Sequence, residues 1–107
     1  MKVTELIQKM ELSIETEGVD SEITGCYMGD ILSLALSDIF QGNIWITAQT
    51  NINIVAVAFH NGASCIILPN GFEPDNDARE CAQNKKIYIL SSNKTAYELG
   101  KTICTLI

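Results

Sequence analysis

The sequence predicts a single three-layer α/β/α domain over residues 1–107, built on a mostly parallel sheet of four to five strands. A chain of 107 residues has room for one core and no second domain. Its central thirty residues, 43–72, contain no Asp, Glu, Lys or Arg, which is typical of the middle of a globular core. The second half alternates short apolar runs with helical patterns, and this order implies parallel strands joined by right-handed crossovers.

The first thirty residues are predicted to form a short helix and two strands. Thr4 is a suitable N-cap for a helix that reaches Met10, because the apolar residues between them recur at helical spacing. Strict alternation over 12–16 predicts a strand, and Gly18 closes that unit. The run 23–28 predicts a second strand.

The next segment is predicted to be a helix over 31–39, since its apolar residues recur every three or four positions. Asp30 stands where an N-cap is expected. Two short apolar strands are then predicted, at 44–47 and 64–68, inside the uncharged segment.

The connection between those two strands is ambiguous from propensity alone. Residues 52–59 are rich in β-branched side chains and could form a strand. Three features favour a buried helix: Thr50 or Asn51 can cap it, its alanines permit close packing, and Gly62 lies where a helix ends in a left-handed residue.

The last third is predicted to contain two helices and one strand. Residues 69–71 form a turn, and a helix runs from the Pro-Asp pair at 74–75 to about Asn84. A strand follows at 86–90. The final helix is predicted over 95–106, with its apolar residues on one face.

Composition excludes several classes of partner. The 13 acidic and 7 basic residues give a net charge of −6, which argues against a nucleic-acid backbone or an anionic membrane surface. The longest unbroken apolar run, 54–59, is too short to span a bilayer, and the first residues lack the apolar region of an export signal. We therefore expect a cytoplasmic location.

The four cysteines form no CxxC pair, and the chain has one histidine. This spacing indicates no metal site and no cofactor. In a cytosolic domain such residues are expected to be small buried hydrophobes that stay reduced. The cysteines are Cys26, Cys65, Cys81 and Cys104.

Candidate ligand-binding residues lie in three polar loops, at 47–51, 69–73 and 91–95. Each loop follows a predicted parallel strand and precedes a helix, so all three should converge at the carboxyl ends of the strands, where α/β proteins bind ligands. The candidates are Thr47, Gln49, Thr50, Asn51, Asn70, Gly71, Ser91, Ser92 and Thr95. The alternative is that these residues act only as helix caps and turn formers.

No catalytic residue is identified. The sequence lacks phosphate-binding glycine loops, a nucleophile elbow and a metalloprotease motif. His60 is expected at the exposed end of a helix, away from the three loops. Glu73 and Asp75 are first of all acids at a helix start, where they favour the helix dipole.

Four runs of the sequence resemble a family in their order and spacing: 29–33, 45–58, 66–75 and 89–92. Together they look like a DRTGG domain standing alone. The resemblance implies a fold similar to the N-terminal domain of HPr kinase and a regulatory role. It also implies dimerisation, because the domain pairs inside phosphotransacetylases and CBS-domain pyrophosphatases, in the latter close to a bound dinucleotide polyphosphate.

Two motifs differ from the family pattern. Ala48-Gln49-Thr50 stands where the family often has Gly-Asp-Arg, and Pro69-Asn70-Gly71 stands for its Thr-Gly-Gly. The first difference removes a bidentate phosphate donor. The second keeps one glycine only, which restricts how closely the backbone can approach a ligand.

The favoured hypothesis is a non-catalytic regulatory module that forms a homodimer and binds a small polar ligand, such as a nucleotide, or a partner protein. The dimer is expected because a chain this small has little room to bury its larger rings. Those rings are Phe40, Trp45, Phe59 and Phe72. The alternatives are a small enzyme or kinase-related protein that uses the three loops, and a structural subunit of a larger complex.

Overall fold

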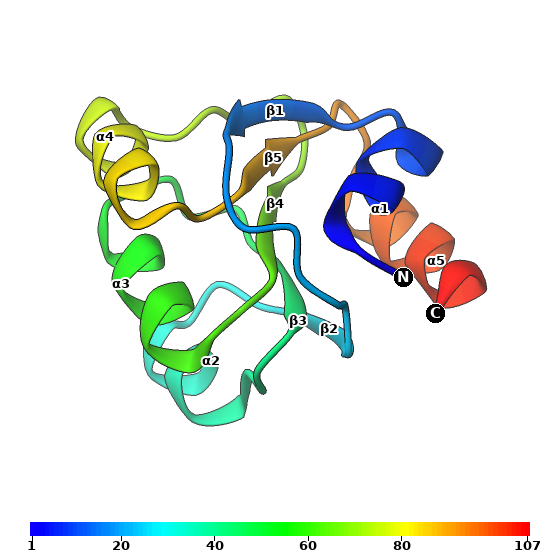
Figure 1. Cartoon of the computed structure of the whole chain (residues 1–107), viewed down its shortest axis with the longest axis horizontal. Helices are drawn as coiled ribbons and strands as arrows, with labels where there is room; N and C mark the ends of the chain where they lie inside the picture. Colours follow the sequence, from blue (N-terminus) through cyan, green and yellow to red (C-terminus); the bar gives the residue numbers. More distant parts are fainter.

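Five strands form one sheet in the order β1-β5-β4-β3-β2, and helices cover both of its faces (Figure 1). This computed structural model describes all 107 residues. The elements in chain order are α1 (Val3–Met10), β1 (Ser13–Thr16), β2 (Gly25–Met28), α2 (Leu32–Asp38), β3 (Asn43–Ile46), α3 (Asn53–Asn61), β4 (Cys65–Leu68), α4 (Asn76–Lys85), β5 (Ile89–Ser91) and α5 (Ala96–Leu106). Strands β2 to β5 are parallel, and β1 pairs antiparallel with β5. The predicted three-layer α/β/α fold is confirmed.

The central strands β3 and β4 are buried along their whole length. Ile44 and Ile46 pack with α1 and α5 on one face of the sheet, which we call the α5 face. Trp45 packs with α2, α3 and α4 on the other face, which we call the α3 face. Burial on both faces requires apolar residues at successive positions. The prediction that residues 43–72 form the core is confirmed for these strands.

The ambiguous segment 52–59 is a helix, as favoured. Helix α3 ends at Gly62, which has a φ of 70° and adopts the left-handed conformation expected of a C-terminal glycine. At its start, the Asn53 N–H donates to the Asn51 side-chain oxygen over 2.9 Å. Asn51 therefore bonds to the first N–H of the helix, although the N-cap position itself is Ile52, which has no side-chain bond.

Two predicted caps are wrong. Thr4 lies inside α1, and its backbone N–H and hydroxyl both donate to the Asp20 carboxylate over 2.9 Å. The Asp30 side chain does not cap α2, because its Oδ1 accepts from the Thr47 hydroxyl and the Ala48 N–H instead. In both cases the sheet topology brings a distant partner into range, and a local pattern cannot show that.

Two further expectations need correction. Strand β5 begins at Ile89 and not at 86, because Lys86 adopts a left-handed conformation that ends α4. Burial of the cysteines holds fully only for Cys65: Cys26 and Cys104 are exposed and Cys81 is half-buried. No helix of the structure is both long and apolar enough to cross a membrane.

Candidate functional site

The three polar loops meet at the carboxyl ends of the parallel strands, as predicted. The Thr50 hydroxyl donates to Asp75 Oδ1 over 2.9 Å, which joins the first loop to the start of α4, just after the second loop. The Asn70 N–H donates to the Lys94 carbonyl over 2.9 Å, and the Gly71 N–H to the Ser92 carbonyl over 2.8 Å. These backbone bonds hold the second loop against the third.

The first loop is built around Asp30, which is not among the ligand-binding residues predicted from the sequence. Asp30 Oδ1 accepts from the Thr47 hydroxyl over 2.8 Å and from the Ala48 N–H over 2.7 Å. The Gln49 side-chain amide donates to the Asp30 carbonyl and accepts from the Asn51 side chain. The sequence indicated Asp30 only as a helix cap, because no local pattern shows that the strand before it pairs beside β3.

The third loop is likewise occupied by its own hydrogen bonds. The Ser92 hydroxyl accepts from the Lys94 N–H, and Thr95 forms a capping box with Glu98 at the start of α5. The Thr95 N–H donates to the Glu98 carboxylate, and this bond lowers the pKa of Glu98 below its usual value. Thr95 is therefore a helix cap.

A bulge in β1 adds an ion pair to the same end of the sheet. The pairing of β1 with β5 shifts register between Ile14 and Thr16, so Glu15 is the extra residue. Its carboxylate accepts from the Ser91 hydroxyl over 2.7 Å and from Arg79 Nη2 over 2.9 Å. Arg79 is the single arginine of the chain, and this pair engages it. Sequence patterns gave no signal for either partner.

Most of the candidate side chains are thus bonded within the protein. Thr47, Gln49, Thr50 and Asn51 bond to each other or to Asp30 and Asp75, Ser91 bonds to Glu15, Ser92 bonds to Lys94 and Thr95 bonds to Glu98. Their binding of a ligand stays a prediction.

The side chains left free on this surface come from the second and third loops. Asn70, Asn93 and Lys94 are exposed, and their side chains make no hydrogen bond or ion pair within the protein. Phe72 lies in the same loop as Asn70 and is 41% exposed. A Cβ placed on Gly71 would lie 3.0 Å from Asn93 Oδ1, so the two loops are in contact here. We call Asn70, Phe72, Asn93 and Lys94 the loop surface.

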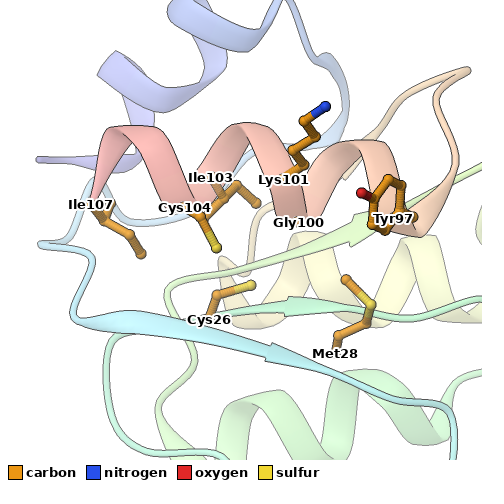
Figure 2. A pocket seen from close by; sticks show the side chains of 8 residues that line it. All are labelled: Cys26, Met28, Tyr97, Gly100, Lys101, Ile103, Cys104 and Ile107. Atoms are coloured by element: carbon orange, nitrogen blue, oxygen red, sulfur yellow. The ribbon is translucent and has the colours of Figure 1, made fainter.

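The largest groove lies elsewhere, between β2 and α5 on the α5 face (Figure 2). It measures about 750 Å³. Its lining is mostly apolar and consists of Cys26, Met28, Tyr97, Gly100, Lys101, Ile103, Cys104 and Ile107. The sulfur atoms of Cys26 and Cys104 both point into the space between strand and helix. Although Cys26 is exposed as a residue, partial desolvation of its thiol beside α5 raises the pKa of that thiol to about 11, and the Cys104 thiol adds to the shift.

This groove was not predicted from the sequence. Cys26 and Met28 are alternate residues of the predicted strand 23–28, which places both on one face of the sheet. The sequence did not show that β2 would end the sheet, because that depends on the order of the strands.

Comparisons with known proteins agree with this geometry. A family model described as the DRTGG domain matches residues 26–106. No curated protein matches the chain. The chain is similar to the crystal structure of the CBS and DRTGG domains of the regulatory region of Clostridium perfringens pyrophosphatase, complexed with its activator diadenosine tetraphosphate. The TM-score is 0.71 at 13% identity, over 94% of this chain and 45% of that chain, so this chain spans less than half of the similar structure.

Proposed function

The chain belongs to the DRTGG domain family, and from that premise we propose that it is a non-catalytic regulatory domain that senses a small polar ligand such as a nucleotide. The similar structure from Clostridium perfringens is a regulatory region bound to a dinucleotide activator, which supports nucleotides as the ligand class. We place the ligand at the loop surface, because its polar side chains are free while those around it are bonded within the protein. This is the observation that carries the proposal.

The loop surface offers chemistry suited to a nucleoside. The exposed ring of Phe72 can stack on a base, since base–aromatic stacking contributes about 1–3 kcal/mol per base. The amides of Asn70 and Asn93 can each donate and accept hydrogen bonds at the edge of a base. Lys94 supplies one positive charge for one anionic group.

The same surroundings disfavour a long polyphosphate. Arg79, the residue type best suited to bind phosphate in a bidentate manner, is paired with Glu15. Glu73 in the second loop and Asp75 just after it add two carboxylates. We therefore propose that a nucleoside or nucleoside monophosphate binds more tightly than a tetraphosphate does.

Thermal-shift and calorimetric titrations with adenosine, AMP, ATP and diadenosine tetraphosphate test the proposal. We expect a concentration-dependent rise in melting temperature, largest for adenosine or AMP. Asn70→Gly removes the amide and keeps the left-handed backbone of this residue, and Lys94→Gln removes the charge. Each should weaken binding about tenfold, in line with the loss of one hydrogen bond or charge contact.

Lys2→Gln is the matched control, because Lys2 is an exposed lysine at the start of α1, outside the loop surface. It should bind the ligand as the parent protein does. The absence of any thermal shift with all four compounds at millimolar concentration would contradict a nucleotide-sensing role.

We also propose that the chain acts as a homodimer in the cytoplasm. The rings expected to need an interface are in fact exposed: Phe40 is 75% and Phe59 56% accessible, whereas Trp45 is fully buried. Large exposed apolar side chains usually mark an interaction surface. A different protein fits the same surface as a partner in place of a second copy. The mass of the purified protein in solution distinguishes a homodimer from a monomer that binds such a partner.

A further inference from the structure

The exposed apolar side chains concentrate at one edge of the molecule. Seven of the twelve large ones lie on β2, on α2 with its flanking residues, and on α5. They are Met28, Ile31, Leu34, Leu36, Phe40, Tyr97 and Ile107, which we call the β2 surface. Strand β2 ends the sheet here, α5 lies beside it on one face, and α2 is the outermost helix of the other face (Figure 1).

The β2 surface is large enough for a stable interface. A large side chain such as an aromatic presents about 150–250 Å² when fully accessible, and these seven are roughly half exposed, which gives about 700 Å². One partner of a standard protein interface contributes about 800 Å². The largest apolar patch on a typical monomer measures about 300–600 Å².

Charge indicates which partner fits this surface. The whole chain carries a net charge of −6, so two copies repel each other across most orientations. Residues 25–40 contain two charged side chains: Asp30, whose carboxylate is bonded to Thr47 and Ala48, and the exposed Asp38 at the end of α2. Helix α5 carries Glu98 and Lys101, whose charges cancel. Three of the thirteen acidic residues, Asp30, Asp38 and Glu98, lie on or between these elements, so two copies repel each other less through the β2 surface than across the rest of the molecule.

The backbone of β2 provides a self-complementary element. It pairs with β3 on one side and has no strand on the other, so part of its N–H and C=O groups face outward. A two-fold axis perpendicular to the sheet sets two such strands side by side in antiparallel orientation. The same axis places α5 beside the second α5, and α2 beside the second α2.

We propose that a second copy of this chain docks on the β2 surface, with the two β2 strands pairing in antiparallel orientation to extend the sheet across the dimer. The proposal rests on the homodimer of the proposed function and locates its interface. The groove between β2 and α5 becomes part of that interface, so its apolar lining is covered in the assembled protein. The loop surface stays free for ligand.

Sedimentation velocity of the full chain over a range of concentrations tests this interface. We expect the parent protein at twice the chain mass, and the Leu34→Glu and Tyr97→Glu variants at the single-chain mass. Both side chains are at least half exposed, so a charge there disturbs the fold little. Val19→Glu is the matched control, since Val19 is 63% exposed in the segment that is bonded to Lys86 and is not part of the β2 surface, and this variant should stay dimeric.

The rate of alkylation of Cys104 is a second test of the interface. It reports whether the groove is covered and needs no charged substitution in the groove. Cys104 lies in the groove, whereas Cys81 is half-buried on α4 outside it. With iodoacetamide, we expect Cys104 to react several times more slowly in the parent dimer than in monomeric Leu34→Glu. The rate at Cys81 should be the same in both proteins.

Two results would overturn the proposal in different ways. If the parent protein has the single-chain mass up to millimolar concentration, both this interface and the homodimer are wrong, and ligand sensing is judged by the nucleotide titrations alone. If the parent is a dimer and both glutamate variants stay dimeric, the homodimer stands and its interface lies elsewhere.

Discussion

The two edge strands of the sheet differ in how they meet solvent. Strand β1 is antiparallel to its neighbour, carries a bulge at Glu15 and places that carboxylate on Arg79. Strand β2 is parallel to its neighbour, has no charged residue and is flanked by exposed apolar side chains. Bulges and charged residues are the devices that protect an edge from pairing with another strand. One edge is thus protected and the other is open.

The protection of β1 depends on a side chain inside the strand ladder. The buried Thr16 hydroxyl donates to the Ile87 carbonyl over 2.6 Å and accepts from the Ile89 N–H over 2.9 Å. A side chain takes over bonds that backbone would otherwise make, and Glu15 is turned toward Ser91 and Arg79 as a result. Arg79 Nη1 also donates to the Glu15 carbonyl over 2.9 Å, so one backbone acceptor of β1 is already occupied. The open edge of β2 has no such insertion, which is why we locate the dimer there.

The largest expected effect concerns glycine at the two edges. A Cβ on Gly18, just after β1, would lie 2.3 Å from the Tyr88 nitrogen and 2.7 Å from the Ile87 carbonyl carbon. Backbone cannot move aside, so Gly18→Ala should lower the free energy of unfolding by about 3 kcal/mol. Urea unfolding measures this loss directly.

Gly25→Ala at the β2 edge is the matched control. Its nearest neighbour would be the Asn43 side-chain nitrogen at 3.1 Å, and a side chain can shift by a few tenths of an ångström. We expect a change of less than about 1 kcal/mol. An equal loss at both positions would show that β2 is enclosed as tightly as β1, against the open edge described above.

The next effect comes from the hydroxyl in the β1 ladder. Thr16→Val keeps the shape of the side chain but leaves the Ile87 carbonyl and the Ile89 N–H without a partner. Buried unpaired groups cost about 1–3 kcal/mol, so we expect a loss of about 2 kcal/mol in urea unfolding. Thr24→Val, beside β2, removes a hydroxyl that donates to the Gln41 carbonyl and accepts from the Asn43 side-chain amide, but Thr24 is exposed and water can replace it. A loss at Thr24 as large as at Thr16 would contradict this difference.

The ion pair of the β1 edge gives a smaller effect. Glu15 is 13% exposed, so Arg79→Met leaves a mostly buried carboxylate with the Ser91 hydroxyl as its remaining side-chain partner. We expect a loss of about 1–2 kcal/mol in chemical unfolding, between the values for surface and buried pairs. Lys9→Met breaks the half-exposed Lys9–Glu5 pair on α1 and should cost only about 0.3 kcal/mol. Equal losses in the two variants would mean that the β1 pair is no more than a surface contact.

The fold that both edges share could be predicted from the sequence, whereas the difference between the edges could not. Periodicity and turn residues predicted the helices and the parallel strands, because local spacing determines which face of each element is apolar. The uncharged segment 43–72 located the centre of the sheet in the same way. Gly62 and Thr95 correctly predicted helix ends, since the conformation that each adopts is local.

Features that join distant segments were not predictable in this way. The pairing of Asp20 with Thr4 spans sixteen residues, and that of Glu15 with Arg79 spans sixty-four. The exposure of Cys26 depends on β2 being the last strand of the sheet. Strand order and register are set by packing of the whole chain, and no local pattern contains them. The convergence of the three loops was predictable because parallel strands place all their carboxyl ends together.

The smallest expected effect is a dependence of the melting temperature on acid pH, which comes from the segment between β1 and β2. Asp20 lies between β1 and β2, and its carboxylate accepts two hydrogen bonds from Thr4 at the start of α1. The bond from the Thr4 N–H is the main reason why the pKa of Asp20 lies below its usual value. The folded protein therefore holds this carboxyl deprotonated at a pH where the unfolded chain takes up a proton. The stabilisation is fully present above the ordinary pKa of an aspartate and is lost as the pH falls through the lowered value.

Between about pH 5 and pH 2, the melting temperature of the parent protein should fall more steeply than that of Asp20→Asn. Asp38→Asn, at an exposed carboxylate that makes no hydrogen bond, should follow the parent curve. Identical slopes for the parent and Asp20→Asn would show that the linking segment is not held by this carboxylate. The hydrogen bonds between Asp20 and Thr4 would then not determine the position of the segment that leads into β2.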